Sequence, residues 1–333
     1  MEPVHPENID SMPYARLGGD GRRASLVPYI VAVIFVPLLC FALLFWGVTT
    51  DWFLRHNDYP FLATIGYGRG LKDVNCQVVM YGDSGAVTGM DPRVVERITH
   101  MKACNIAQLG TVRLVDETST LDLYLSQNAR PKYIVFQYHP WEFHRYRTWN
   151  DPLDSFIEPI YFLIRYRFNA GTARILITHH RETFQFITWE FNSLARGLFL
   201  KSLHLGPSYI YDDAAKRRAE DAGLYSLPLP PETHCEAGFG LRPEGLYYDP
   251  EWTNGLRSKY QSKADHVLLN VQPLPDCLPI AALVDTRLKG RYDNIFQTLP
   301  INLFNDKDGH YTDQGAAVNS TAIANEILAQ EQR

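Results

Sequence analysis

The sequence predicts an α/β protein in which helices cover both faces of a parallel sheet. Two observations support this prediction. Short apolar runs alternate with helical patterns between residues 77 and 137, and the alternation resumes after residue 250. Alternation of this kind is typical of a parallel sheet that is buried on both sides. Side chains that follow the carboxyl ends of neighbouring strands meet at one edge of such a sheet, and we expect a functional site there.

Composition limits the class of protein. The chain has 333 residues, of which 46% are hydrophobic and 21% are charged. This is an ordinary globular composition, and the length is enough for one large domain with an insertion. The net charge of −5 and the lack of basic runs argue against a nucleic-acid partner.

The first 48 residues predict a membrane anchor. Residues 26–47 carry no charged side chain, whereas Arg16, Arg22 and Arg23 precede them. About 20 apolar residues cross a bilayer as a helix, and arginines mark its cytoplasmic end. We therefore predict a disordered cytoplasmic tail over 1–25 and a transmembrane helix over 26–48.

The rest of the chain, residues 49–333, should then lie outside the inner or cytoplasmic membrane, in the periplasm or the extracellular space. A cleaved signal peptide is the alternative. It is disfavoured because the apolar stretch is too long and no Ala-x-Ala-like site follows it.

The alternating region begins with a strand at the apolar run 77–81. Asp91 and Pro92 then predict the start of a helix near 91–101, since Asp is a good N-cap and Pro suits the first helical position. The same patterns predict a strand at 104–108, a helix near 114–128 and a strand at 132–137.

The alternation stops after Trp141, which predicts a helical and loop insertion over about 145–260. Its part from 151 to 203 is rich in aromatic residues with interleaved arginines, so it is either a local helical core or a surface that docks on the membrane or a membrane partner. A helix near 250–263 and a strand at 266–271 resume the sheet. Thr312 then caps a final helix that buries apolar residues at helical spacing.

Five cysteines are present, and Cys40 lies inside the predicted membrane helix. The other four would face an oxidising compartment, where disulfides persist. Cys76 and Cys104 stand at the starts of adjacent predicted strands, so they either pair or serve as small buried apolar residues. No cysteine has metal-ligand spacing, and we predict neither a metal nor a cofactor.

Residues with catalytic potential stand at both ends of this region. Ser84 follows the first strand and is followed by the small residues Gly85 and Ala86. Asp308 and His310 stand just before the final helix. A serine hydroxyl needs a base, and a histidine oriented by a carboxylate is the usual one. The pattern predicts a Ser–His–Asp site made of Ser84, His310 and Asp308, with Asp306 as the alternate carboxylate.

These residues resemble the SGNH (GDSL-type) hydrolase-fold family. Its first block, Gly-Asp-Ser after the first strand, is matched by residues 82–84, and its last block is matched by residues 308–316, Asp-Gly-His-Tyr-Thr-Asp-Gln-Gly-Ala. The commonest family spacing, Asp-x-x-His, would place the Asp at Lys307 and is not met. The Asp-x-His spacing is similar to the alginate-acetylating branch. The resemblance implies a three-layer sandwich around the parallel sheet.

The middle blocks of the family are matched less closely. The run Asn105–Gly110 resembles the second block, which implies that the backbone N–H of Gly110 joins that of Ser84 in binding an oxyanion. The third block lacks its Asn and resembles the membrane-tethered D-alanyl transfer proteins. His139 either replaces that donor or lies beneath the site as a structural residue.

Three further residues lie in or next to the first and third blocks. We expect these residues, Asp83, Gln137 and Trp141, to bind the substrate.

The resemblance implies extracytoplasmic, serine-dependent transfer of an O-acyl group, most simply acetyl, to a cell-surface polysaccharide such as cellulose or alginate. The expected partners are the membrane, a multi-spanning O-acyltransferase or polysaccharide synthase complex, and the polysaccharide acceptor. Two alternatives remain open: a carbohydrate esterase, and a non-catalytic SGNH-fold assembly protein.

Overall fold

The computed structural model divides the chain into two compact units, Met1–Phe45 and Trp46–Arg333. The structure describes residues 26–48, 50, 60–109, 119–140, 170–181, 183–184, 188, 223, 230–235, 248, 250–295, 298–306 and 309–333.

The N-terminal part contains helix α1, Leu26–Val48, where the sequence predicted a helix. Apolar side chains along it, such as Phe35 and Leu39, are largely exposed. Within the residues that the structure describes, no helix meets the combination of length and apolar character needed to cross a membrane. The role of α1 as an anchor stays a prediction.

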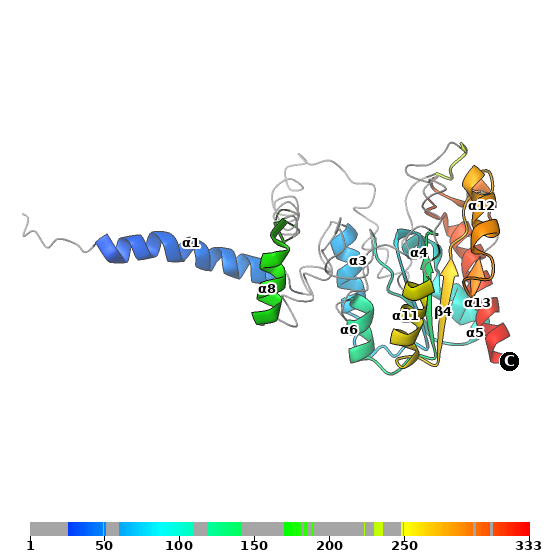
Figure 1. Ribbon diagram of the computed structural model, residues 1–333, viewed down its shortest axis with the longest axis horizontal. Coiled ribbons are helices and arrows are strands. Elements are labelled where there is room, and N and C mark those ends of the chain that lie inside the picture. Colours follow the sequence, from blue (N-terminus) through cyan, green and yellow to red (C-terminus); the bar gives the residue numbers. More distant parts are fainter. Residues whose placement is uncertain are drawn as a thin grey trace, which may run out of the picture. The chain divides into compact units, whose positions relative to one another are not determined.

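The second unit is built on a five-stranded parallel sheet in the order β2-β1-β3-β4-β5. Figure 1 shows strand β4 of this sheet between helices on either side. Its strands are β1 (Val78–Gly82), β2 (Ala103–Asn105), β3 (Tyr133–Tyr138), β4 (His266–Val271) and β5 (Asn294–Ile295). This confirms the predicted α/β class and parallel sheet. Strand β2 lies on one side of β1, whereas β3, β4 and β5 follow on the other side. The strand order therefore reverses at β1 and β3, which flank the switch point.

Side chains of the strands alternate between two apolar cores, one on each face. On one face, residues such as Val79 and Phe136 pack with α6 (Thr120–Gln127), α11 (Pro250–Gln261) and α12 (Pro279–Leu288). Helix α3 (Pro60–Arg69) lies against α6.

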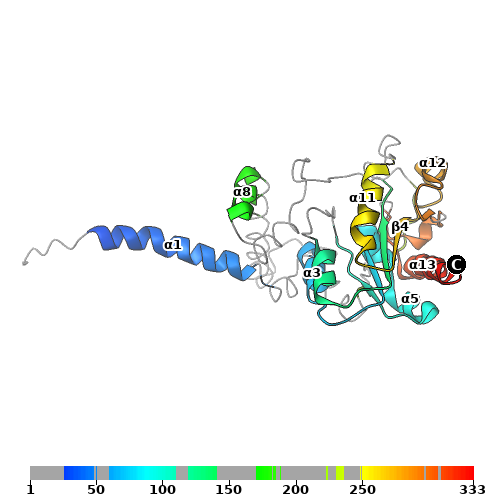
Figure 2. The ribbon, with the colours of Figure 1, turned by 60° about the horizontal axis from the view of Figure 1, so that its bottom comes forward.

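On the other face, Met80 and Val135 pack with α4 (Ser84–Gly89), α5 (Pro92–Thr99) and α13 (Asp313–Glu331). Figure 2 shows α5 and α13 on one side of the strands and α6 and α11 on the other. The short 3-10 helix η3, Ile301–Leu303, precedes α13.

Capping confirms two predicted helix starts. The Asp91 side chain accepts a hydrogen bond from the Arg93 backbone N–H and Pro92 takes the first helical position. The Thr312 hydroxyl accepts from the Gly315 N–H, and the following helix buries Ala316 and other residues at helical spacing. These local interactions satisfy N–H groups that the helix itself leaves unpaired.

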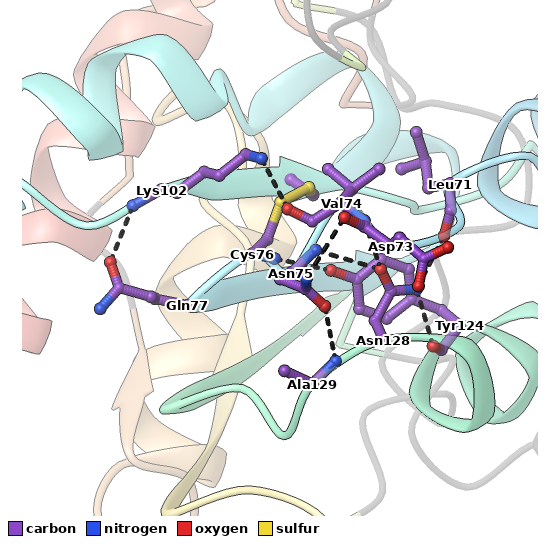
Figure 3. Close-up of a disulfide and its surroundings, with 11 residues drawn as sticks. Leu71, Asp73, Val74, Asn75, Cys76, Gln77, Lys102, Tyr124, Asn128 and Ala129 are labelled. Atoms are coloured by element: carbon purple, nitrogen blue, oxygen red, sulfur yellow. Dashed lines mark hydrogen bonds between the residues drawn. A yellow bond between two sulfur atoms is a disulfide. The ribbon is translucent and has the colours of Figure 1, made fainter.

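Two disulfides join the four cysteines that the sequence left open: Cys76–Cys104 and Cys235–Cys277. Figure 3 shows the first of them, which ties the segment before β1 to β2. In the same region Asn128 accepts hydrogen bonds from the Val74 and Asn75 N–H groups and donates to the Leu71 carbonyl. The start of β1 is therefore held by a covalent bond and by side-chain hydrogen bonds. Cys40, the fifth cysteine, is a free thiol and exposed.

The C-terminal end of the predicted insertion, about 145–260, overlaps helix α11. Helix α11 packs on β4, and Leu256 and Tyr260 belong to the core of the sheet. Helix α8, Ala170–Thr178, lies within the predicted insertion, where Ile177 and Phe184 are exposed. Most of the aromatic stretch 151–203 lies outside the described residues.

Candidate active site

The carboxyl ends of β1, β3 and β4 bring three sequence segments together. Ser84, His139 and Gln272 each follow one of these strands within two residues. Tyr138 on β3 is aligned with Val271 on β4, and the Gln272 N–H donates to the Tyr138 carbonyl at 3.0 Å. These three segments therefore lie together at the carboxyl ends of the strands, next to the β1/β3 switch point.

The turn that carries Ser84 is tight. A Cβ on Gly82 would lie 1.9 Å from the Gln137 carbonyl oxygen, so no larger residue fits where β1 passes β3. Asp83 caps α4, and Ser84 is the first residue of that short helix. Ser84 is half-buried, and its hydroxyl makes no hydrogen bond with the part of the chain that the structure describes. No described residue therefore uses this hydroxyl to hold the turn.

The Asp83 carboxylate links the serine turn to the end of β3. One oxygen accepts from the Gly85 N–H at 3.0 Å and the Ala86 N–H at 3.4 Å. The other accepts from the His139 N–H at 2.8 Å and lies 2.7 Å from His139 Nδ1. Burial acts to raise the pKa of the Asp83 carboxyl, but the charge and hydrogen bonds of His139 outweigh it and lower that pKa. Asp83 is therefore an ionised acceptor, and His139 carries hydrogen on Nδ1.

This arrangement corrects the predicted role of Asp83. Its side chain is buried, with both oxygens used inside the protein. Asp83 positions the serine turn rather than binding substrate.

The second histidine, His310, pairs with Asp306. His310 Nδ1 lies 2.5 Å from one oxygen of Asp306, and the His310 N–H donates to the other at 3.1 Å. The sequence pattern favoured Asp308 and kept Asp306 as the alternate. Asp308 lies outside the described residues. The carboxylate that the structure shows bonded to His310 is Asp306, the alternate of the prediction.

A single hydroxyl joins the serine helix to the histidine segment. The single hydrogen of Thr88 Oγ1 is directed at the carbonyls of Ser84, at 3.2 Å, and Gly85, at 3.3 Å, and Oγ1 accepts from the Tyr311 N–H at 3.2 Å. Ser84 begins the helical turn that ends at Thr88, and His310 precedes Tyr311 directly. The structure thus brings Ser84 and His310, 226 positions apart in the sequence, to the two sides of one hydrogen-bonded bridge.

Tyr311 fixes the position of the segment that carries His310. It is buried, its hydroxyl donates to the Pro273 carbonyl at 2.9 Å, and a Cβ on Gly89 would lie 2.5 Å from its ring. Burial, and then the Asp83 charge, raise the pKa of the Tyr311 hydroxyl well above its ordinary value. Tyr311 therefore stays a neutral donor at any physiological pH.

Gln137 does not reach the site. Its carboxamide is fully buried and exchanges hydrogen bonds with the Asn319 carboxamide at 3.1 and 3.2 Å. It ties β3 to α13, which corrects the prediction that it binds substrate. Gly110 and Trp141, the other predicted oxyanion and substrate contacts, lie outside the described residues.

Sequence reasoning missed Thr88 and Gln272. Gln272 follows the strand predicted at 266–271, so the rule that pointed to Ser84 and His139 also pointed to it. Nothing in the sequence near Thr88 signals its bridging role, because the bridge depends on a segment more than 200 positions away.

A separate cavity of about 780 Å³ lies between α13 and the edge of the sheet at β5, away from Ser84 and His310. Its lining includes Asn294, Ala322, Asn325 and Glu326. Asn270 Nδ2 donates to Glu326 Oε2 at 2.8 Å. Burial raises the pKa of the Glu326 carboxyl to about 7, a rise that the Asn270 hydrogen bond opposes and the Asp293 charge reinforces.

Glu326 should make stability depend on pH. The folded state holds its proton up to pH about 7, whereas the unfolded chain releases it near the ordinary value of 4.5. The folded state therefore loses stability as the pH rises from about 4.5 to 7. A difference of about 2.5 in pKa corresponds to at most about 3.4 kcal/mol, which partial exposure reduces to about 1–2 kcal/mol.

Glu326→Gln should consequently raise the melting temperature at pH 8 and change it much less at pH 5. Thermal unfolding of both proteins at the two pH values measures this. An equal effect at both would show that Glu326 titrates normally.

Among the residues that the structure describes, no three His, Cys, Asp or Glu side chains come close enough to hold a metal ion. The chain matches no protein-family model, no curated protein and no solved structure.

Proposed function

We propose that this protein is an extracytoplasmic serine acyltransferase that passes an O-acyl group, most simply acetyl, to a cell-surface polysaccharide. One observation carries the proposal. The hydrogen-bonded pair His310–Asp306 lies beside the turn of Ser84, joined to it through Thr88 at the carboxyl ends of the strands. A serine next to a histidine that a carboxylate orients is the arrangement that nucleophilic acyl transfer needs.

In the first half-reaction Ser84 Oγ attacks the acyl carbonyl and His310 Nε2 takes the hydroxyl proton. The carbonyl π electrons move to its oxygen, which becomes an oxyanion. When the oxyanion collapses, the bond to the leaving group breaks and His310 returns the proton to it. In the second half-reaction a hydroxyl of the acceptor attacks the acyl-serine, and His310 takes the proton of that hydroxyl. When the second oxyanion collapses, the bond between the acyl carbon and Ser84 Oγ breaks and His310 gives the proton to Oγ.

In this mechanism the Asp306 carboxylate accepts hydrogen from Nδ1 of His310, which leaves Nε2 facing the serine and stabilises the imidazolium when it forms. In the structure the Ser84 hydroxyl forms no hydrogen bond with His310 or with any other described residue. Bonds between a nucleophile and its base are often long before substrate binds and tighten afterwards.

The finer fold assignment is part of the same proposal. We place the chain with the SGNH-type three-layer sandwiches because Gly-Asp-Ser follows β1 directly and the Asp–His pair precedes the last helix. The parallel sheet with helices on both faces is consistent with that assignment.

The proposed location outside the cytoplasm has two supports. The N-terminal residues contain a long uncharged apolar stretch preceded by arginines, which favours a single-pass anchor with a cytoplasmic N-terminus. Independently, four cysteines form two disulfides, which persist in oxidising compartments. The anchor would hold the enzyme near a multi-spanning partner that supplies the acyl donor.

The experiment that tests the proposal uses the full-length protein in detergent with a fluorophosphonate probe and p-nitrophenyl acetate. An acyltransferase should be labelled at Ser84, and its slow release of p-nitrophenol should speed up when a polysaccharide acceptor is added. Rapid release without an acceptor would identify an esterase instead. Absence of labelling at Ser84 would contradict a catalytic role and favour a non-catalytic assembly protein.

A further inference from the structure

We propose that Gln272 is a catalytic residue of the Ser84 site and donates a hydrogen bond from its side-chain amide to the oxyanion of the acyl intermediate. This inference rests on the proposed acyl transfer at Ser84. The Gln272 side chain is buried, and its polar atoms have no partner among the described residues.

Gln272 is 1% exposed, and neither Oε1 nor Nε2 of its carboxamide has a hydrogen-bond partner in the described part of the chain. Buried polar side-chain atoms are nearly always paired, because leaving water without a new hydrogen bond costs free energy. Gln137, another buried glutamine near this end of the sheet, follows the rule and pairs with Asn319. The contrast indicates that a ligand or a reaction intermediate is the partner of Gln272.

The position of the carboxamide identifies that partner. It lies against Gly85, where an added Cβ would be 1.8 Å from Oε1 and 2.7 Å from Nε2 of Gln272. It also lies against Gly309, where an added Cβ would be 2.9 Å from Nε2. Gly85 follows the proposed nucleophile directly and Gly309 precedes the proposed base. The carboxamide thus occupies the space between the two loops whose side chains carry out the chemistry.

Two glycines make this placement possible. Any side chain at residue 85 would overlap the carboxamide, and Gly309 has a φ of +92°, a conformation that other residues rarely adopt. The backbone of Gln272 is fixed as well, because its N–H donates to the Tyr138 carbonyl at the end of β3. The carboxamide is therefore held on a rigid strand end and not on a mobile loop.

The chemistry of the site needs a donor at this place. The oxyanion is the former carbonyl oxygen, which stays bonded to the carbon that Ser84 Oγ attacks, so it lies within a few ångströms of the backbone of residues 84 and 85. Donors fixed in advance in a place closed to water stabilise such a charge strongly. An amide N–H keeps its hydrogen at all pH values, so Gln272 would act without titrating.

The test replaces Gln272 with methionine, which has a similar length and volume and no N–H donor. Because no described residue bonds the carboxamide, Gln272→Met should keep or raise the melting temperature. It should nevertheless lower the kcat for p-nitrophenyl acetate by about 10²- to 10³-fold, the effect of removing one oxyanion donor. It should also weaken the binding of a boronic acid that forms a tetrahedral adduct with Ser84 by a similar factor, with KM for the ester changed little.

Gln137→Met is the matched control. It removes a buried carboxamide whose partner remains, so it should lower the melting temperature, unlike Gln272→Met. A Gln272→Met protein with wild-type kcat and wild-type boronate affinity would overturn the proposal. So would a parallel loss of stability and activity in both Gln272→Met and the smaller Gln272→Leu, since that would mean a structural role. If the wild-type protein itself fails to react at Ser84, the proposed function fails, and that outcome is distinct from both.

Discussion

Ser84→Ala should abolish acyl transfer while leaving the fold intact. Loss of the nucleophile alone lowers kcat by on the order of 10⁶-fold in a serine hydrolase with a complete triad, because base and carboxylate then have nothing to activate. Stability should hardly change. The Ser84 hydroxyl makes no hydrogen bond to a described residue, and the turn is held by Asp83 through the Gly85 and Ala86 N–H groups.

The measurement compares p-nitrophenol release and melting temperature in Ser84→Ala, the wild type and Ser262→Ala. Ser262 is a serine on the protein surface whose hydroxyl donates to the Lys259 carbonyl at 3.5 Å, so the same substitution there should change neither quantity. Full activity in purified Ser84→Ala would remove the serine from the mechanism. A large fall in its melting temperature would instead show that the hydroxyl supports the turn.

The elements that the sequence predicted best depend on local interactions. The strand expected at 266–271 is β4 with the same bounds, and the last helix begins after the predicted cap, Thr312. In both cases a short apolar run or a capping side chain decides the structure within a few residues. One element without such a signal was missed. Strand β5 has two residues, too few to show any periodicity.

Helix α12 was missed although Pro279 stands at its first position, a signal that the sequence offers. Helix α6 begins at Thr120, later than the start expected near 114. Its capping box of Ser119 and Asp122 marks the true start, and this pattern is visible in the sequence. Both helix starts are therefore marked in the sequence, by Pro279 and by the capping box. These marks are weaker signals than the pattern of apolar residues.

The candidate site was predictable in part because the topology of a parallel sheet determines where strand ends meet. That topology predicts that the segments of Ser84 and His139 lie together, and Asp83 does join them by hydrogen bonds. It cannot decide between Asp306 and Asp308, because the choice depends on how the loop before α13 folds back. In the structure the Asn305 N–H donates to the His310 carbonyl, which closes the loop and brings residue 306 to the imidazole.

Asp306→Asn should lower kcat by about 10⁴-fold, as removal of the orienting carboxylate does in a serine protease. Asparagine keeps the size of the side chain, but its amide can donate to Nδ1 of His310. It then favours the tautomer with hydrogen on Nε2, which cannot accept the serine proton. The Asp306 side chain is partly exposed, at 27% of its surface, so the fold should tolerate the change with a small loss of stability.

Asp308→Asn provides the comparison, since it makes the same substitution two residues away in the same loop. The hydrogen bonds between His310 and Asp306 predict that Asp308→Asn retains activity within about tenfold of the wild type. Steady-state rates on p-nitrophenyl acetate for both variants, with melting temperatures as a check on folding, measure the difference. The larger loss in Asp308→Asn would mean that the Asp-x-His pattern of the sequence identifies the working carboxylate. His310 would then have to change partners when substrate binds. The larger loss in Asp306→Asn would instead tie catalysis to the carboxylate that already bonds both the imidazole and the backbone of His310.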